Sequence, residues 1–280
     1  MGRHPIVLVT GAGGQVGRAL RLHLPDQRFL DLSGLDVTQA SSVHAAIDGV
    51  DAVVHLAAMT GVDDCEVHPA RAWAVNAEGT RHVAEAAMER GTRLIYVSTD
   101  YVFDGTKQGE YREDDRPNPV NVYGRTKLAG EAHVRTVPGA VIVRTSWVIG
   151  EGRNFVRTIV SAAREGKELR VVGDQVGRPT FAGDLARAIV HILDHGLTGI
   201  INVAGDEDPC TWADLAELAL RGVGLKSAVE RVDTETYKRA AGRVVAPRPM
   251  NSVLALGKAR RLGVPLGSWR TSLERYVEEL

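Results

Sequence analysis

Apolar runs alternate with amphipathic segments through residues 1–150 of the chain. The run at 6–10, IVLVT, is continuous and rich in β-branched residues, which is typical of a strand buried on both faces of a parallel sheet. Similar runs at 51–60, 93–103 and 140–148 predict further strands, and the segments between them carry apolar residues at helical spacing. This alternation predicts an α/β fold, a Rossmann-like, doubly wound parallel sheet with helices on both faces.

The second half of the chain predicts a return to this sheet and a smaller C-terminal domain. The segment 177–196 has the pattern of a helix that ends at Gly196, and 198–205 predicts another strand. We therefore divide the chain into a sheet domain and a smaller domain, which comprise residues 1–150 plus about 180–206, and about 151–179 plus 207–280.

Composition and charge narrow the class of partner. The 280 residues are 44% hydrophobic and 25% charged, with a net charge of −1 and no basic block, so we expect no nucleic-acid partner. Cys65 and Cys210 lie far apart in sequence and give neither a disulfide framework nor a zinc spacing, which suits a reducing cytoplasm. No stretch approaches the roughly 18 apolar residues of a membrane span, so we expect a cytoplasmic protein without membrane contact.

A glycine-rich segment follows the first predicted strand and opens a helix. Gly11, Gly14 and Gly17 have the spacing GxxGxxG within GAGGQVG, a variant of the dinucleotide-binding fingerprint. Glycine permits the tight turn and lets the backbone approach a pyrophosphate, whose charge the helix N-terminus favours. We predict dinucleotide binding here, against the alternative of a glycine-rich turn without a ligand.

Tyr123 and Lys127 stand one helical turn apart, and Thr99 lies near the end of the predicted strand 93–103. Ligands of open parallel sheets bind beyond the carboxyl ends of the strands, where Thr99 can meet a helix that carries the Tyr–Lys pair. Reduction of a ketone needs a proton donor, and we expect the Lys127 ammonium to lower the pKa of Tyr123 towards neutrality. Thr99 would hydrogen-bond the substrate oxygen as charge develops. The alternative is a Tyr–Lys pair that merely decorates a helix surface.

The order of these motifs resembles the extended branch of the short-chain dehydrogenase/reductase superfamily. The match is closer to the dTDP-4-dehydrorhamnose reductase family and runs nearly end to end, most specifically in STDYVFDG (98–105) and YGRTKLAGE (123–131). The resemblance implies reduction of the C4 ketone of dTDP-4-dehydro-L-rhamnose to dTDP-L-rhamnose by NAD(P)H, with Tyr123 as proton donor. This reaction is the last step of dTDP-rhamnose biosynthesis. The sheet domain would bind NAD(P) and the smaller domain the sugar nucleotide.

The resemblance also implies roles by position. Thr99, Tyr123 and Lys127 would be the catalytic triad. The coenzyme would contact the glycine loop, the exit of a third strand at 35–37, the loop after the strand at 51–60 and the triad helix, namely Gly11, Gly14, Gln15, Val16, Asp36, Val37, Ala57, Ala58, Thr60, Tyr123 and Lys127. The dTDP-sugar would contact Thr60, Val62, Thr99, Asp100, Tyr101, Tyr123, Trp147, Asn154, Gln175, Arg178 and Arg248.

The sequence indicates the coenzyme preference, metal binding and oligomeric state less clearly than it indicates the triad. An acidic side chain at the end of the second strand favours NADH and an Arg favours NADPH, and Asp31 and Arg18 are the respective candidates. We expect NADPH, with NADH also accepted, as the family often tolerates both. Some relatives are described with Mg2+, but no motif here indicates a metal ligand, and we expect a homodimer. His55 stands where many relatives carry Asn, outside the triad.

Other functions fit parts of this pattern. A reductase or epimerase of a related nucleotide deoxysugar, such as a dihydrostreptose-type reductase, shares the Tyr–Lys apparatus. Dehydratases of this branch carry an acidic pair directly after the Thr, and here Tyr101 follows Asp100 and breaks that pair. A non-catalytic NADP-binding subunit, such as the regulatory subunit of methionine adenosyltransferase, also resembles these reductases, although an intact triad favours catalysis.

Overall fold

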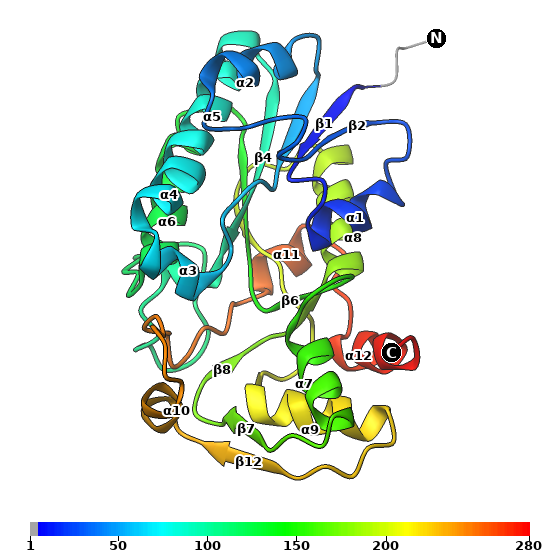
Figure 1. Ribbon diagram of the computed structural model, residues 1–280. Coiled ribbons are helices and arrows are strands. Elements are labelled where there is room, and N and C mark those ends of the chain that lie inside the picture. The colour runs from blue at the N-terminus through cyan, green and yellow to red at the C-terminus, as the bar shows by residue number, and fades with distance from the viewer. Residues whose placement is uncertain (1–4) are drawn as a thin grey trace.

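A six-stranded sheet forms the centre of the computed structural model, which describes residues 5–280 (Figure 1). The strand order is β10-β5-β4-β3-β1-β2, and every neighbouring pair is parallel. The direction of winding reverses between β1 and β3, which makes the sheet doubly wound and confirms the predicted fold class. The strands are β1 (Val7–Thr10), β2 (Arg28–Leu30), β3 (Ala52–His55), β4 (Arg93–Thr99), β5 (Val141–Thr145) and β10 (Gly199–Asn202).

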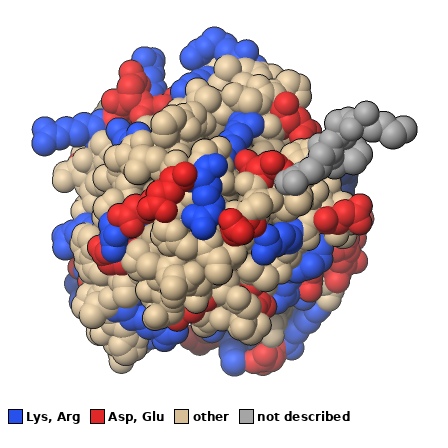
Figure 2. All heavy atoms as spheres, turned by 90° about the horizontal axis from the view of Figure 1, so that it is seen from above, with Lys and Arg blue, Asp and Glu red and all other residues tan. Residues whose placement is uncertain are grey.

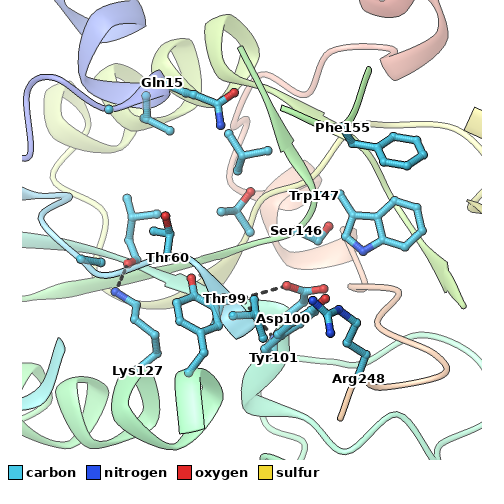
Figure 3. Close-up of a pocket in the computed structure, with 18 of the residues that line it drawn as sticks. Gln15, Thr60, Thr99, Asp100, Tyr101, Lys127, Ser146, Trp147, Phe155 and Arg248 are labelled. Carbon is cyan, nitrogen blue, oxygen red and sulfur yellow. Dashed lines mark hydrogen bonds between the residues drawn. The ribbon is translucent and has the colours of Figure 1, made fainter. Parts of the chain in front are cut away.

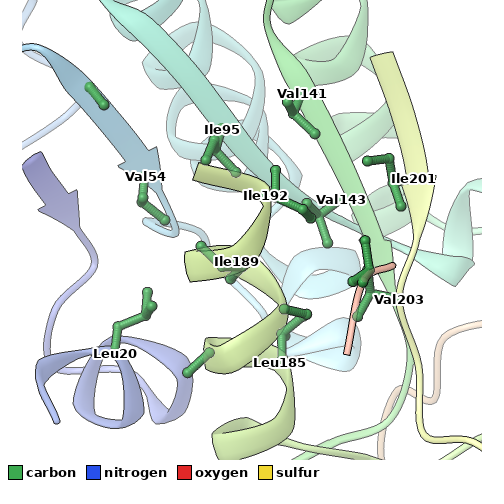
Figure 4. Close-up of a cluster of buried hydrophobic side chains, with 14 of the residues drawn as sticks. Leu20, Val54, Ile95, Val141, Val143, Leu185, Ile189, Ile192, Ile201 and Val203 are labelled. Carbon is green, nitrogen blue, oxygen red and sulfur yellow. The ribbon is translucent and has the colours of Figure 1, made fainter. Parts of the chain in front are cut away.

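Helices cover both faces of the sheet, because successive side chains of each buried strand point to opposite faces. Val9 belongs to a cluster with Leu20 and Ile189 on one face (Figure 4), and Leu8 belongs to a cluster with Val83 on the other. The first face is covered by α1 (Gln15–Arg21), α8 (Ala182–Asp194) and α11 (Gly257–Arg261). The second face is covered by α2 (Ala40–Ile47), α5 (Gly79–Arg90) and α6 (Val122–Val134).

Short elements shape the carboxyl end of the sheet. After β3 come α3 (Val62–Val67), α4 (Pro69–Trp73) and the π-helical turn η1 (Ala74–Glu78), and β4 is followed by the 3-10 turn η2 (Asp100–Val102). Asn121 caps α6, since its side chain accepts from the backbone of Gly124 at 2.7 Å. The backbone N–H of Val122 donates to Glu66 at 2.7 Å, so α3 also fixes the start of α6.

A smaller unit lies beyond the carboxyl ends of the sheet strands (Figure 1). Three short strand pairs contribute to it, β6 (Val148–Ile149) with β9 (Thr180–Phe181), β7 (Leu169–Val172) with β12 (Val229–Val232), and β8 (Val176–Gly177) with β11 (Cys210–Thr211). Its helices are α7 (Phe155–Arg164), α9 (Trp212–Gly222), α10 (Thr234–Ala240) and α12 (Trp269–Glu278). Leu215, Trp269 and Leu273 pack together in its core.

Two sequence predictions are wrong at the level of single elements. Residues 35–37 form no strand, because the Asp36 carboxylate accepts from the backbone N–H and hydroxyl of Thr38, at 3.0 and 2.8 Å, and turns the chain towards α2. The helix predicted over 177–196 begins only at Ala182. The residues ahead of it include two short strands, β8, which pairs with β11, and β9, which pairs with β6.

The boundaries of the two domains remain a prediction. Ala259 and Val264, which we assigned to the smaller domain, belong to the hydrophobic cluster beneath the sheet. The segment around α11 therefore packs on the sheet.

Charged side chains are interspersed on the face seen from above in Figure 2, with basic and acidic groups side by side. This distribution agrees with a net charge of −1. Within residues 5–280, no helix is both long and apolar enough to cross a membrane.

Candidate active site

A cavity of about 840 Å³ opens along the carboxyl ends of the sheet strands and is lined from both the sheet and the smaller unit. This is the position where open α/β sheets bind ligands. Of the residues predicted from sequence, the lining contains Gly11, Gly14, Gln15, Val16, Ala57, Ala58, Thr60, Val62, Thr99, Asp100, Tyr101, Tyr123, Lys127, Trp147, Gln175 and Arg248. The predicted residues outside the lining are Asp36, Val37, Asn154 and Arg178.

The glycine loop packs its backbone tightly against the loop that follows β3. Gly11 has a φ of 68°, and a Cβ there would lie 2.7 Å from the backbone nitrogen of Ala57. A Cβ at Gly17 would lie 2.7 Å from Ala12, so α1 can meet the strand only with glycine at that position. Gln15 lies in the first turn of α1, and its buried Oε1 has no hydrogen-bond partner among the described residues. Close approach of the glycine backbone at the start of a helix fits a dinucleotide phosphate, whose negative charge the helix N-terminus favours.

Asn76 fixes the loop that follows β3. This fully buried side chain accepts from the backbone N–H of Met59 at 2.7 Å and donates to the Met59 carbonyl at 3.0 Å. It also donates to the hydroxyl of Thr126 on α6 at 3.1 Å, which ties the loop to the triad helix. Asn76 therefore holds Ala57, Ala58 and their neighbours in one shape from behind.

A second buried chain of hydrogen bonds supports the same loop. The hydroxyl of Thr10 accepts from the backbone N–H groups of Leu56 and Ala57, at 3.2 and 3.3 Å, and lies 2.7 Å from Nδ1 of His55. The other ring nitrogen of His55 lies 3.1 Å from the hydroxyl of Thr80. Burial first, and then the charge of Lys127, lower the pKa of His55 to about 3, so the ring is neutral.

Lys127 lies in the first half of α6, and its ammonium contacts groups of β4. Its Nζ donates to the carbonyl of Val97 at 2.8 Å (Figure 3). It also lies 4.0 Å from the ring centre of Tyr96. Burial lowers the pKa of Lys127 to about 7, and the nearby Glu131 opposes this.

Tyr123 reaches the cavity beside the end of β4. Its helix approaches η2 so closely that a Cβ at Gly124 would lie 2.1 Å from the carbonyl oxygen of Tyr101. We predicted that Lys127 lowers the pKa of Tyr123, and this is wrong in the structure. Burial raises the pKa of Tyr123 well above its usual value, partly offset by a hydrogen bond with Thr99. Removal of the phenol from water therefore dominates the pKa of Tyr123.

Thr99 and Asp100 meet at the end of β4. The Thr99 hydroxyl lies 2.9 Å from Oδ1 of Asp100 and accepts from the backbone N–H of Tyr101 at 3.2 Å (Figure 3). Asp100 is 2% exposed, and burial raises its pKa to about 7 although the hydroxyls of Ser252 and Thr99 lower it.

A buried ion pair supports the residues predicted as the triad. Glu131 of α6 accepts from both Nε and a terminal nitrogen of Arg144, at 2.9 and 2.7 Å, and from the hydroxyl of Ser98 at 2.7 Å. Both charged side chains are fully buried. The bidentate contact locks α6 against β4 and β5, which keeps Thr99 and Tyr123 in register.

Trp147 stacks on another indole. Its ring centre lies 3.6 Å from that of Trp212 at an interplanar angle of 10°, and the ring centre of Phe155 lies 4.6 Å from that of Trp212. Trp147 has a φ of 47°, an uncommon backbone conformation for a residue other than glycine. A Cβ at Gly177 would lie 2.5 Å from the Trp147 ring, so glycine makes room for the indole.

Arg248 reaches the cavity from a segment that crosses from the smaller unit to α3. Its guanidinium donates to Asp63 and to the carbonyl of Ala246, both at 2.8 Å. Asp63 also binds Arg243 and accepts from the backbone N–H of Ala246 at 3.0 Å. Asp63 is thus the point at which α3 holds this segment.

The remaining predicted residues divide between the cavity and the interior. Gln175 lines the cavity and donates to the hydroxyl of Thr234 at 3.0 Å. Asn154 caps α7 and donates to the hydroxyl of Tyr276 at 2.6 Å, which explains its position away from the cavity. Arg178 is buried and pairs with Glu110 at 2.5 Å, while its Nε and the second terminal nitrogen have no partner among the described residues.

The residues predicted to contact adenine, Asp36 and Val37, also lie outside the cavity lining. Val37 is buried beside Gly79 in the hydrophobic cluster of α2 and α5, and Asp36 binds Thr38. Asp31, which follows β2, lines the cavity instead, while Arg18 pairs with Glu151 at 3.2 Å.

Several lining residues escaped the sequence analysis, in particular Leu32, Phe155, Arg170, Trp212 and Tyr237. Most come from the smaller unit, where short strands gave no clear pattern. The aromatic side chains among them were the one available signal. No group of three His, Cys, Asp or Glu residues suited to a metal ion occurs in the described part of the chain.

Comparisons with known proteins identify similar sequences and a similar fold. Residues 5–280 match the family model described as the RmlD substrate binding domain. The chain is 37% identical over 294 residues to the dTDP-4-dehydrorhamnose reductase of Aggregatibacter actinomycetemcomitans, with 96% of this chain and 97% of that protein covered. It is 37% identical over 276 residues to the dTDP-4-keto-6-deoxy-D-glucose reductase of Streptomyces niveus, with 95% and 94% covered. A crystal structure of dTDP-4-dehydrorhamnose reductase from Bacillus anthracis in complex with NADP has a TM-score of 0.92 at 35% identity, covering 99% of this chain and 100% of that one.

Proposed function

The chain belongs to the dTDP-4-dehydrorhamnose reductase family, and from this premise we propose that it reduces dTDP-4-dehydro-L-rhamnose to dTDP-L-rhamnose with NAD(P)H. This reaction is the last step of dTDP-rhamnose biosynthesis. The observation that carries the proposal is the meeting of Thr99, Tyr123 and Lys127 at one cavity, alongside the glycine loop.

The coenzyme fits the residues that are present. The glycine loop and the start of α1 would hold its pyrophosphate. Ala57 and Ala58 lie in the loop after β3, and their small side chains would leave room for the coenzyme. Thr60, Tyr123 and Lys127 would lie at its nicotinamide end. The coenzyme supplies the hydride for the C4 carbon of the sugar.

The side chains of the triad donate the proton and stabilise the charges that its transfer creates. Tyr123 donates its phenolic proton to the ketone oxygen as negative charge develops there. Its raised pKa keeps the phenol protonated at neutral pH, and the charged form of Lys127 favours the phenolate that remains after transfer. Thr99 donates a hydrogen bond to the same oxygen. Trp147, Trp212 and Phe155 form an aromatic cluster in the cavity lining.

For the coenzyme we propose NADPH, with NADH also accepted. The relative from Bacillus anthracis was solved with NADP, which supports the phosphorylated coenzyme. Asp31 lines the cavity, and a carboxylate there can accept from a ribose 2′-OH, which supports use of NADH. The homodimer and the cytoplasmic location stay predictions.

A second candidate is the reductase of a related dTDP-deoxysugar. The relative from Streptomyces niveus, named for dTDP-4-keto-6-deoxy-D-glucose, shares as much identity with this chain as a rhamnose-pathway relative does. Both candidates use the same triad and differ only in the sugar.

The test is oxidation of NADPH or NADH in the presence of dTDP-4-dehydro-L-rhamnose, generated in the assay by the preceding enzymes, with the product identified by mass. We expect turnover to dTDP-L-rhamnose. The Tyr123→Phe variant should bind the coenzyme normally and lose activity by about 10²- to 10⁴-fold. Turnover of dTDP-4-keto-6-deoxy-D-glucose alone would favour the second candidate, and a fully active Tyr123→Phe variant would refute the proton-donor assignment.

A further inference from the structure

The hydroxyl of Thr99 has no hydrogen to spare in its present contacts. Its oxygen accepts from the backbone N–H of Tyr101 at 3.2 Å, and it lies close enough to the phenol of Tyr123 to influence the pKa of that group. Its single hydrogen is directed to Oδ1 of Asp100 at 2.9 Å. Because a hydroxyl carries only one hydrogen, donation to an ionised Asp100 leaves none for the oxygen of a ketone.

The surroundings of Asp100 do not suit a carboxylate. The side chain is 2% exposed, and its Oδ2 takes no hydrogen bond of normal geometry from residues 5–280. Arg248 lies nearby in the cavity wall (Figure 3). Its guanidinium, however, donates to Asp63 and to the carbonyl of Ala246. A buried carboxyl that lacks a cationic partner is favoured in its neutral form.

We propose that Asp100 remains protonated during the reaction and donates its hydrogen to Thr99, which frees the hydrogen of Thr99 for the substrate oxygen. The distance of 2.9 Å suits a hydrogen bond in either direction. No proton leaves Asp100, and the proton that reaches the product comes from Tyr123. Asp100 is then a positioning residue that acts through Thr99, and this inference rests on the proposed function.

The charges that face Asp100 agree with this assignment. Burial raises the pKa of Asp100 to about 7, with the hydroxyls of Ser252 and Thr99 in opposition. The phenols of Tyr101 and Tyr123 face it from η2 and α6, and charge on Asp100 raises the pKa of both. An ionised Asp100 would therefore weaken Tyr123 as a proton donor, so the neutral form aids both triad members.

The test compares the kcat of Asp100→Asn with that of the wild type across about pH 5.5 to 9. The amide of the variant donates to Thr99 at every pH, so at about pH 6 we expect activities within about threefold. Above about pH 7 the ratio of variant to wild type should rise, approaching tenfold per pH unit, as Asp100 of the wild type ionises. Lys127 loses its charge over the same pH range in both proteins, so its effect on kcat cancels in the ratio of the two kcat values. A ratio that stays flat, or a variant that is inactive at every pH while binding NADPH normally, would overturn the proposal.

Asp26→Asn is the matched control, because Asp26 is an exposed carboxyl outside the cavity lining and should give a flat ratio near one. Infrared spectroscopy of the enzyme with NADP+ gives a readout that needs no substrate. At about pH 6 the wild type should show the C=O stretch of a protonated carboxylic acid that Asp100→Asn lacks. Its absence from the wild type would refute the proposal. A wild type that shows this band but turns over no dTDP-sugar would instead count against the proposed function.

Discussion

Gly11 allows the glycine loop to touch the loop after β3, and its replacement by alanine tests that contact. Gly11 has a φ of 68°, and an added Cβ would meet the backbone of Ala57 at 2.7 Å. Gly49 is a close control, since it also has a φ of 68° but has no atom within 4 Å of an added Cβ. The two alanine variants share the backbone strain, and only one has the clash.

The expected magnitudes follow from this comparison. A left-handed conformation costs a residue with a Cβ about 1 kcal/mol, which a stiffer unfolded chain partly offsets. Gly49→Ala should therefore lower the free energy of unfolding by at most about 1 kcal/mol. Gly11→Ala adds forced displacement of backbone, comparable to overpacking at about 1–3 kcal/mol, for a total of about 2–4 kcal/mol.

Urea unfolding followed by circular dichroism measures both free energies, and a fluorescence titration measures NADPH affinity. Because the displaced backbone of Gly11 lies where the pyrophosphate would bind, we expect Gly11→Ala to weaken NADPH binding by at least about tenfold, or about 1.4 kcal/mol. Gly49→Ala should leave this affinity unchanged. Equal losses of stability in the two variants, or normal NADPH binding by Gly11→Ala, would refute the reasoning.

Three other variants probe the cavity wall and the supporting network. Asp63→Asn should raise the KM for the dTDP-sugar by about tenfold with little change in kcat, because Arg248 loses a charge-assisted contact; an unchanged KM in steady-state kinetics would contradict this role. Asp31→Asn should raise kcat/KM for NADPH relative to NADH, by roughly fivefold, because an exposed negative charge near the 2′-phosphate is removed; an unchanged ratio would exclude Asp31 as the determinant. The pKa of His55 falls to about 3 on folding, so the unfolded state binds more protons below about pH 6.5 and stability should drop there by up to about 1.4 kcal/mol per pH unit. Urea unfolding of His55→Asn should show a shallower loss between about pH 6.5 and 4, and an unchanged slope would show that His55 does not titrate on unfolding.

Local pattern accounts for much of the sheet and for the outline of the site. The continuous β-branched run before Gly11 favoured a strand buried on both faces, which β1 confirms, and the glycine spacing indicated a turn suited to a dinucleotide. The i, i+4 spacing placed Tyr123 and Lys127 on one face of a helix. Short strands of the smaller unit were harder to predict, because two-residue pairs such as β8 with β11 have no period of their own.

Errors arose where a side chain bonds locally or where contacts are distant in sequence. Asp36 turns the chain through Thr38 and so prevents the predicted strand exit. Asn154 has a polar side chain of the kind that binds ligands, but in the structure it caps the N-terminus of α7.

The sequence by itself predicted most strands of the central sheet, the glycine loop and the placement of Tyr123 and Lys127 on one helix face, because these depend on periodicity and on residue type at short spacing. Only the tertiary structure decided how the triad is charged and held. Burial lowers the pKa of Lys127 and raises those of Tyr123 and Asp100, and burial depends on every element that covers the cavity. The partnership of Asp63 with Arg248 joins residues 185 positions apart, and such contacts follow from the packing of two units against each other.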